Sequence, residues 1–216
     1  MSDAGENAGI SFGQELIRKG VHLSSLWMVA LIFFWRFGLM HLFYFFAVCF
    51  ILNILCEFAY SMNCPVITPI YGTLFRSMLR KKPQRGEWIV SGSPPVFAAA
   101  ALVCLLFPQA IAAMSLGVML TADTAAALIG RRFGKHKLNS SKSVEGTIAF
   151  IVVGILFSAF ILRMSGEMTC GLMIGAIIGV ILAAIAELYE KQLHLDDNLT
   201  IPILTGLPAT LIFYFF

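Results

Sequence analysis

The sequence predicts an all-α integral membrane protein, a polytopic bundle of about seven transmembrane helices with a cytosolic N-terminus. Hydrophobic residues make up 59% of the 216 residues and charged residues only 12%, whereas about a quarter of a soluble domain is charged. Seven apolar stretches each approach the ~20 residues that a helix needs to cross a bilayer. A chain of this length leaves no room for a second domain, so residues 1–216 are expected to form one membrane-embedded unit.

The predicted spans follow one another with mostly short connections. They comprise residues 20–36, 39–60, 88–107, 109–130, 144–163, 170–189 and 199–216. Two connections, residues 61–87 and 131–143, are longer and contain several Lys and Arg residues. The first nineteen residues are polar, and no small-residue cleavage site follows the first apolar run. We therefore expect residues 1–19 to remain as a cytosolic segment ahead of the first span.

The distribution of Lys and Arg predicts the orientation of the bundle. If the N-terminus lies inside, thirteen of the fifteen Lys and Arg residues fall in inside segments, and only Arg36 and Arg163 fall outside. Cytoplasmic loops of membrane proteins carry such an excess of positive residues. The N-terminus and both long loops are therefore predicted to face the cytosol, and we expect a multi-pass protein of a bacterial inner membrane.

Polar residues within or beside the spans gather on the same side. Glu15, Arg18, Lys19 and His22 are spaced by three and four residues, so they share a helical face. The other polar residues, in chain order, are Glu57, Glu87, Asp123, Lys142, Glu145, Glu187, Asp196, Asp197 and Asn198. Their convergence predicts a single cytosol-facing site.

The third span is interrupted near its inner end by the motif Ser91-Gly-Ser-Pro-Pro95. Ser93 is suited to cap a helix, and Pro94 to occupy its first position. The residues just before Ser93 would then be non-helical at membrane depth, which is tolerated where backbone lines a wet cavity. A simple kink or a late helix start is an equally good interpretation.

A stripe of small residues follows the sixth span. Gly171, Gly175, Gly179 and Ala183 recur every four residues, and the same stripe ends at Glu187. Small residues at this spacing allow two helices to approach closely. Packing inside the monomer is favoured, and a homodimer seam through the three glycines is the alternative. In either case the stripe faces protein, so Glu187 is predicted to face the bundle interior.

The connection after the fourth span combines cations with glycines. Gly130 and Gly134 permit a close backbone approach or a positive φ. The fifth span begins after Ser141 or Ser143, where helix amides attract anions. The cations are Arg131, Arg132, Lys135, Lys137 and Lys142. Cations alone are more typical of a loop that grips anionic lipid headgroups, but the nearby acids, which lipid anchoring does not require, favour a polyphosphate ligand.

Asp123 is the strongest candidate metal ligand, because an ionisable residue inside a membrane span marks a functional site by default. Mg²⁺ is usually held by one or two carboxylates, with phosphate oxygens and water completing its shell. The other candidate metal ligands are Glu187, Asp196 and Asp197.

Several of these acids also have a structural interpretation. Asp123 can form an ion pair with Arg131 or Lys142, since buried charges are often paired. Asp196 and Asp197 can form a solvated turn that caps the last span, and Asn198 fits either role.

Two further polar residues remain open between alternatives. His22 titrates near neutrality and is suited to deprotonate a lipid hydroxyl, or it is an interfacial histidine without a task. Glu57 either pairs with Arg80 or Arg85 or faces the site.

Five blocks of the sequence occur in an order that resembles a known family. The blocks are Glu15–His22, Arg85–Glu87 followed by Ser91–Ser93, Asp123–Lys135, Lys142–Gly146, and Glu187 with Asp196–Pro202. They resemble the polyprenol kinase family, which includes dolichol kinase, phytol kinase and the CTP-dependent diacylglycerol kinase. The resemblance covers nearly the whole chain and implies CTP as the phosphoryl donor, a membrane alcohol as the acceptor and a divalent metal such as Mg²⁺.

The resemblance suggests a role for each candidate residue. Phosphoryl transfer depends on positioning and charge neutralisation, so Asp123 with Glu187 or Asp197 is expected to hold Mg²⁺ on the CTP phosphates. Lys142 with Arg131 or Arg132 would neutralise the transferred phosphoryl group. His22 or Glu145 would orient or deprotonate the alcohol. Other residues expected at the nucleotide are Gly134, Lys135 and Ser143. Residues expected to contact lipid or support the structure are Arg18, Lys19, Glu57, Arg85, Glu87 and Asn198.

Two other functions are weighed against a kinase. A related pattern occurs in CDP-diacylglycerol synthases, so a phosphatidate cytidylyltransferase is the first alternative, although the Asp196-Asp-Asn198 block favours the kinase branch. A transporter or lipid-binding membrane protein is the second, but the sequence shows neither an internal repeat nor paired broken helices. No nucleic-acid partner is expected, and the sequence does not select the lipid acceptor.

Overall fold

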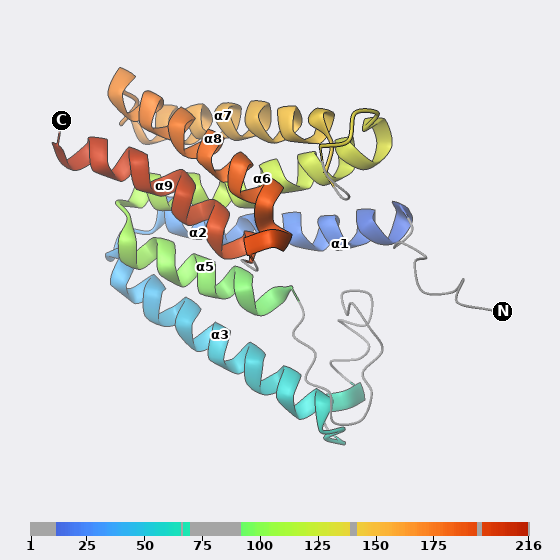
Figure 1. The fold of residues 1–216 in the computed structure, drawn as a ribbon. Helices are drawn as coiled ribbons and strands as arrows, with labels where there is room; N and C mark the ends of the chain where they lie inside the picture. Colours follow the sequence, from blue (N-terminus) through green and yellow to red (C-terminus); the bar gives the residue numbers. More distant parts are fainter. Residues whose placement is uncertain (1–11, 66, 70–91, 139–141, 194–195, 216) are drawn as a thin grey trace.

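The computed structural model describes residues 12–65, 67–69, 92–138, 142–193 and 196–215. These residues form an all-α bundle, and they contain no β-strand beyond one isolated bridge between Lys137 and Ser143 (Figure 1). The helices are α1 (Phe12–Ser24), α2 (Leu26–Phe34), α3 (Leu39–Ser61), α5 (Ser93–Leu106), α6 (Gln109–Phe133), α7 (Val144–Ser165), α8 (Cys170–Leu193) and α9 (Asp197–Phe215). The predicted fold class is confirmed.

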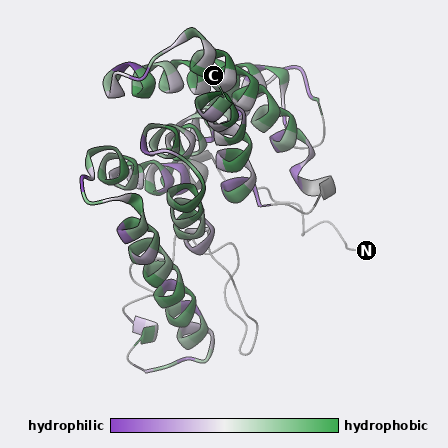
Figure 2. Cartoon of the chain, turned by 90° about the vertical axis from the view of Figure 1, so that its left-hand side faces the viewer, coloured by the Kyte–Doolittle hydropathy of each residue, from purple (hydrophilic) through white to green (hydrophobic). Residues whose placement is uncertain are grey.

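Six helical segments of the described chain are long and apolar enough to span a membrane. They are Leu16–Phe34, Leu39–Ser61, Gln109–Phe133, Val144–Ser165, Cys170–Glu190 and Asp197–Phe215. The predicted third span appears as the shorter apolar helix Ser93–Leu106. Hydrophobic residues cover most of the helices (Figure 2), and large ones such as Phe34, Phe37 and Leu156 are exposed. An outer surface of this kind is expected where a protein faces lipid.

Several predicted boundaries are wrong by a few residues. The first span does not begin at residue 20, because the helix already starts at Phe12 and is divided at Ser25 into α1 and α2. The connection predicted at 131–143 begins later, because Arg131 and Arg132 lie in the last turn of α6. Cations at a helix C-terminus stabilise its dipole. The cytosolic connection predicted at 61–87 lies mostly outside the described residues.

Helix α5 begins inside the predicted third span, at Ser93, and the predicted cap is wrong by one residue. Gly92 is the N-cap of α5, and Ser93 is already the first helical residue. Pro94 therefore occupies the second position, where its missing N–H is equally harmless. The helix begins at the cavity described below, which Gly92 and Ser93 both line.

Helix α6 is the centre of the bundle and contacts α1, α2, α5, α7 and α9. Small residues make this possible: Gly117 lies so close to Phe157 of α7 that an added Cβ would come within 2.0 Å of the ring. The amide nitrogen of Gln109 donates to the carbonyls of Ile32, Phe33 and Trp35 at 2.9, 3.1 and 2.6 Å. These hydrogen bonds join the end of α2 to the start of α6. Both α1 and α2 contact α6.

The glycine stripe of α8 packs against α9 within the same chain. An added Cβ at Gly175 would lie 2.8 Å from Ala209 Cα, and one at Gly179 would lie 2.3 Å from the carbonyl oxygen of Thr205. Packing inside the monomer is therefore the correct interpretation. The predicted homodimer seam through Gly171, Gly175 and Gly179 has no support, because α9 already covers these residues.

Gly179→Ala should test this packing. Overpacking typically costs about 1–3 kcal/mol, and we expect the upper end of this range because the added Cβ would meet α9 backbone, with the Thr205 carbonyl oxygen at 2.3 Å. This loss exceeds the ~1 kcal/mol that Ala gains in helix propensity. The measurement is thermal unfolding in detergent together with the molecular mass. Gly171→Ala is the matched control, because its Cβ would meet side chains and no backbone, Ile212 at 3.2 Å and Thr169 Oγ1 at 4.0 Å. An unchanged melting temperature with a changed mass would instead favour the dimer seam.

Candidate active site

The predicted polar residues converge at one end of the bundle, where α6 and α8 approach their C-termini and α5, α7 and α9 begin. Among them Lys19, Asp123, Ser143 and Glu187 are at most 5% exposed. Burial of so many polar groups within apolar helices is costly unless they are paired. The prediction that Glu187 faces the bundle interior is confirmed.

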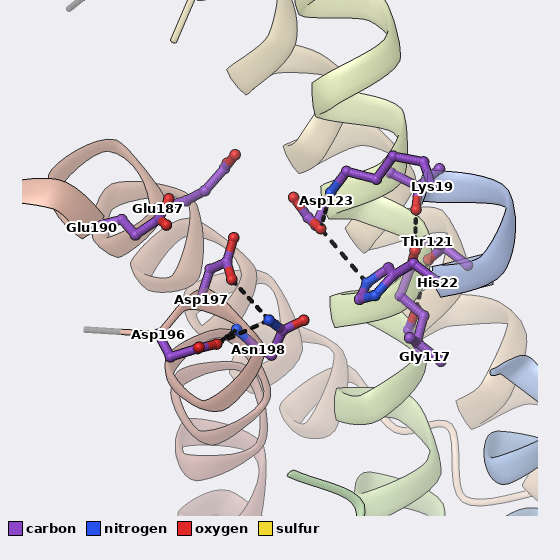
Figure 3. A network of polar contacts seen from close by, with 12 residues as sticks. Lys19, His22, Gly117, Thr121, Asp123, Glu187, Glu190, Asp196, Asp197 and Asn198 are labelled. Carbon is purple, nitrogen blue, oxygen red and sulfur yellow. Dashed lines mark hydrogen bonds and ion pairs between the residues drawn. The ribbon is translucent and has the colours of Figure 1, made fainter. Parts of the chain in front are cut away.

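Asp123 forms a buried ion pair that the sequence did not reveal. The Lys19 ammonium donates a hydrogen bond to Asp123 Oδ2, and His22 Nε2 lies 3.6 Å from the same oxygen (Figure 3). Lys19 and His22 are one turn apart on α1, so one helical face presents both to α6. The predicted pairing of Asp123 with Arg131 or Lys142 is wrong as a direct contact. Lys142 interacts with Asp123 only at longer range.

A second ion pair joins the start of α7 to α8. The Lys142 ammonium lies 2.6 Å from Glu187 Oε1 and 3.5 Å from Glu190 Oε2. Burial by itself lowers the pKa of Lys142, but Glu187 and, to a smaller degree, Asp123 and Glu190 raise the pKa by more. The pKa of Lys142 therefore lies above its ordinary value, and the side chain stays charged at physiological pH. Its stabilising contribution is present below the unfolded pKa and is lost only as pH rises through the folded value.

The two acids at the start of α9, Asp196 just before it and Asp197 as its first residue, have different environments. Asp196 forms a capping turn, in which its carbonyl accepts from the Leu199 and Thr200 amides, at 3.1 and 3.0 Å. Its carboxylate accepts from the Asn198 backbone and side chain, at 3.0 and 2.9 Å. Asp197 instead lines the central cavity, and Asn198 Nδ2 donates to its Oδ1 at 3.1 Å. The capping interpretation therefore fits Asp196, while Asp197 is available to a ligand.

A cavity of about 270 Å³ lies between Asp123 and Asp197, both of which line it. Its lining comes from α1, α2, α3, α5, α6 and the start of α9. In Figure 3, Asp197 and Glu187 lie on one side and Asp123, Lys19 and His22 on the other. The polar lining includes Arg18, Lys19, His22, Asn53, Ser93, Asp123, Asp197 and Asn198, and the apolar lining includes Trp27, Met28, Val96 and Phe97.

The chain between α6 and α7 lies close to α6 and to the N-cap of α7 at Gly134. An added Cβ at Gly134 would lie 2.1 Å from the Gly130 carbonyl oxygen and 2.6 Å from Ser143 Oγ. Ser143 is the N-cap of α7 and accepts a hydrogen bond from the Gly146 amide, at 3.2 Å. Gly134 has a φ of −68°, so its role is close approach rather than positive φ. Ser141 lies outside the described residues.

Glu145 organises the basic segment after α6. Its carboxylate accepts from the backbone N–H groups of Lys135 and His136, at 3.1 and 3.2 Å, and lies 2.8 Å from His136 Nδ1. It does not line the central cavity. This position fits a residue that shapes the basic segment better than one that deprotonates a substrate. Arg131, Arg132, Lys135 and Lys137 are exposed beside it, and the Arg132 guanidinium lies 5.5 Å from the Phe133 ring centre.

Some functional candidates escaped the sequence analysis. Asn53 lines the cavity one helical turn before Glu57, and Glu190 contacts Lys142 one turn after Glu187. Spacing by three or four from a suspected site residue was the available signal. Glu57 is buried in α3. Arg85 and Glu87 fall outside the described residues, as do the side chain of Glu15 and the predicted partner Arg80.

The sequence was also compared with known proteins. No protein-family model matches it, and no solved structure matches it. An uncharacterized protein of Rickettsia prowazekii is 31% identical over 140 residues, which cover 65% of this chain and 67% of that protein. The probable phytol kinase 2 of Oryza sativa chloroplasts is 34% identical over 98 residues, which cover 42% of this chain and 32% of the kinase.

A fungal kinase is similar over a larger part of its length. The CTP-dependent diacylglycerol kinase 1 of Schizosaccharomyces pombe is 25% identical over 154 residues, which cover 67% of this chain and 69% of that protein. The aligned part spans only about a third of the plant phytol kinases. Together with the motif blocks and the helical membrane fold, these similarities show that the chain belongs to the lipid kinase family of the phytol kinases and CTP-dependent diacylglycerol kinases.

Proposed function

We propose that the protein transfers the γ-phosphoryl group of CTP to the hydroxyl group of a membrane lipid alcohol. The observation that carries this proposal is the cavity at the end of the bundle. It brings His22, Asp123 and Asp197 together from α1, α6 and α9, and the Lys142–Glu187 pair lies beside it. The relatives named as CTP-dependent kinases support the donor.

The basic residues beside the cavity supply the nucleotide site in this proposal. Lys142 would neutralise the phosphoryl group in transfer, since preorganised cations stabilise charge that develops in a transition state. Arg131, Arg132 and Lys135 would bind the remaining phosphates. The N-terminus of α7 at Ser143 adds amide groups that favour an anion.

The carboxylates fit a divalent metal ion. In the described part of the chain, Asp197 accepts a hydrogen bond from Asn198 and forms no ion pair, yet it shares the cavity with Asp123. No group of three His, Cys, Asp or Glu side chains in the described residues is close enough to hold a metal alone. Mg²⁺ usually takes only one or two carboxylates together with phosphate oxygens. Asp123 and Asp197 would hold it, with Glu187 nearby, and the ion would supply charge neutralisation on the phosphates.

His22 is the residue that accepts the proton in this proposal. In the transfer, the alcohol oxygen bonds to the γ-phosphorus, and the bond from that phosphorus to the bridging oxygen breaks, so that CDP leaves. The O–H bond of the alcohol also breaks, so one proton must leave the acceptor. Nε2 of His22 is buried and has no hydrogen-bond partner among the described residues. An imidazole nitrogen is suited to take a proton near neutral pH.

The proposed site faces the cytosol, where CTP is present. Cytoplasmic segments carry the excess of Lys and Arg, and the basic segment after α6 lies at the same end of the bundle as the cavity. The lipid alcohol would reach the cavity from the cytosolic leaflet. A bacterial inner membrane is the proposed location.

The decisive experiment uses purified protein in lipid nanodiscs with Mg²⁺ and CTP labelled at the α or the γ phosphate. Diacylglycerol, phytol, polyprenols and phosphatidate are offered as acceptors. We expect label from the γ position, and not from the α position, on an alcohol. Transfer of α label to phosphatidate would show a cytidylyltransferase instead. Absence of transfer to every acceptor would reject both enzymatic functions.

Glu145→Gln should weaken nucleotide binding more than catalysis. The neutral side chain loses the charge that holds the Lys135 and His136 amides, so the basic segment is less well ordered. Hydrogen bonds to a charged carboxylate are stronger than those to a neutral amide, and we expect KM for CTP to rise about tenfold or more. Glu167→Gln, in the exposed segment that follows the other end of α7, is the control. A selective loss of kcat would instead assign Glu145 to the chemical step.

A further inference from the structure

Two buried polar atoms of the cavity residues have no hydrogen-bond partner among the residues that the structure describes. They are Oδ1 of Asn53 on α3 and Nε2 of His22 on α1. Leaving a buried polar atom unpaired costs about 1–3 kcal/mol, and native proteins pair nearly all such atoms. A hydroxyl group that enters the cavity has one hydrogen to donate, and Asn53 Oδ1, which can only accept, is suited to receive it.

The remaining cavity wall is suited to hydrocarbon. Trp27 and Met28 of α2 and Val96 and Phe97 of α5 line this wall. Neither α2 nor α5 contains a charged residue. A cavity with unpaired hydrogen-bonding atoms and an apolar wall fits a molecule with a hydroxyl group at one end and a hydrocarbon chain at the other. A nucleotide, which is polar along its length, does not fit this wall.

The apolar wall also reaches the surface that faces lipid. Helices α1 and α2 pack on α6, α3 packs on α5, and α5 in turn packs on α6 and α9, so the cavity lies where these helices meet. A ring contact between Trp27 and Phe46, with centroids 6.2 Å apart, bridges α2 and α3. Trp27 lines the cavity and is nevertheless 47% exposed. A hydrocarbon chain can therefore leave the cavity at Trp27 and enter the bilayer.

We infer that Asn53 binds the hydroxyl group of the lipid alcohol, and that the first carbons of its tail lie against Trp27 and Phe97. This inference rests on the proposed lipid kinase function and adds the residue that recognises the acceptor and the side from which the lipid enters. The amide oxygen of Asn53 accepts the hydroxyl hydrogen in the bound complex. As the new O–P bond forms, that proton passes to Nε2 of His22.

Steady-state kinetics of Asn53→Leu test the first half of the inference. Leu has the same branched arrangement of heavy atoms as Asn but no hydrogen-bonding group, so we expect KM for the alcohol to rise about tenfold while KM for CTP is unchanged. Leu52→Ala on the exposed side of the same turn is the matched control and should alter neither constant. An unchanged KM for the alcohol in Asn53→Leu would overturn the inference.

Photo-cross-linking tests the same site without requiring turnover. The probe is a long-chain primary alcohol with a diazirine a few carbons from its hydroxyl group, added to the protein in nanodiscs. We expect cross-links in the peptides that contain Trp27 and Phe97, and a severalfold loss of these cross-links in Asn53→Leu but not in Leu52→Ala. Cross-links confined to other helices, or equal labelling of Asn53→Leu, would contradict the inference.

The two measurements separate this inference from the proposed function. If wild-type protein transfers no phosphoryl group but the cross-links depend on Asn53, the lipid alcohol site stands and the kinase function fails. If γ label is transferred and neither KM nor cross-linking depends on Asn53, the kinase function stands and the acceptor site lies elsewhere.

Discussion

Asp123→Asn should abolish phosphoryl transfer, with a fall in kcat of about 10³-fold or more, because charge stabilisation by a bound metal ion supplies several kcal/mol in such reactions. Asp123 is 5% exposed and lies on the central helix of the bundle. It shares the cavity with Asp197, so the two oxygen ligands would act together. The measurement is transfer of γ label from CTP at saturating Mg²⁺ and acceptor.

A structural effect must be separated from this catalytic one. Asp123→Asn leaves the 4% exposed Lys19 without its carboxylate, and breaking a buried pair in this way typically costs about 3–5 kcal/mol. Lys19→Met combined with Asp123→Asn removes both charges and should restore much of the melting temperature. We expect this double variant to remain inactive. Recovery of transfer along with stability would refute a metal-binding role for Asp123.

Lys142→Ala should lower kcat for transfer by about 10²–10³-fold, the usual effect of removing one preorganised group that stabilises transition-state charge. Lys142 lies just before α7, and its ammonium contacts Glu187 and Glu190 of α8. Because its pKa is raised by these carboxylates, the loss should be the same across physiological pH. A rise in KM for CTP with unchanged kcat would show uniform binding instead.

The partner of Lys142 supplies the control for this second prediction. Lys142→Ala leaves the 4% exposed Glu187 with an uncompensated charge, so loss of activity alone would not distinguish catalysis from misfolding. Lys142→Ala with Glu187→Gln removes the unpaired charge and should unfold at a higher temperature than the single variant. If Glu187→Gln alone retains activity, Glu187 positions Lys142 and is dispensable as a metal ligand.

The sequence predicted the membrane bundle and the location of the site better than the contacts within it. Apolar run length placed the spans within a few residues, since a bilayer sets the required length. Helical spacing placed Lys19 and His22 on one face. Neither property says which helix lies opposite that face, so the alternative ion pair of Asp123 was expected with Arg131 or Lys142 and not with Lys19. The spacing of Gly171, Gly175 and Gly179 likewise predicted a close approach without naming α9.

The sequence by itself thus determined the all-α membrane fold, the end of the bundle at which polar residues gather, and the chemical types available there. The tertiary structure decided which of them meet. It separated the capping Asp196 from the cavity-lining Asp197, placed Glu145 in contact with the basic segment and not in the cavity, and brought Asn53 into the same cavity as His22. The physical reason is that periodicity and hydropathy are properties of one helix, whereas ion pairs and cavities depend on how several helices are packed together.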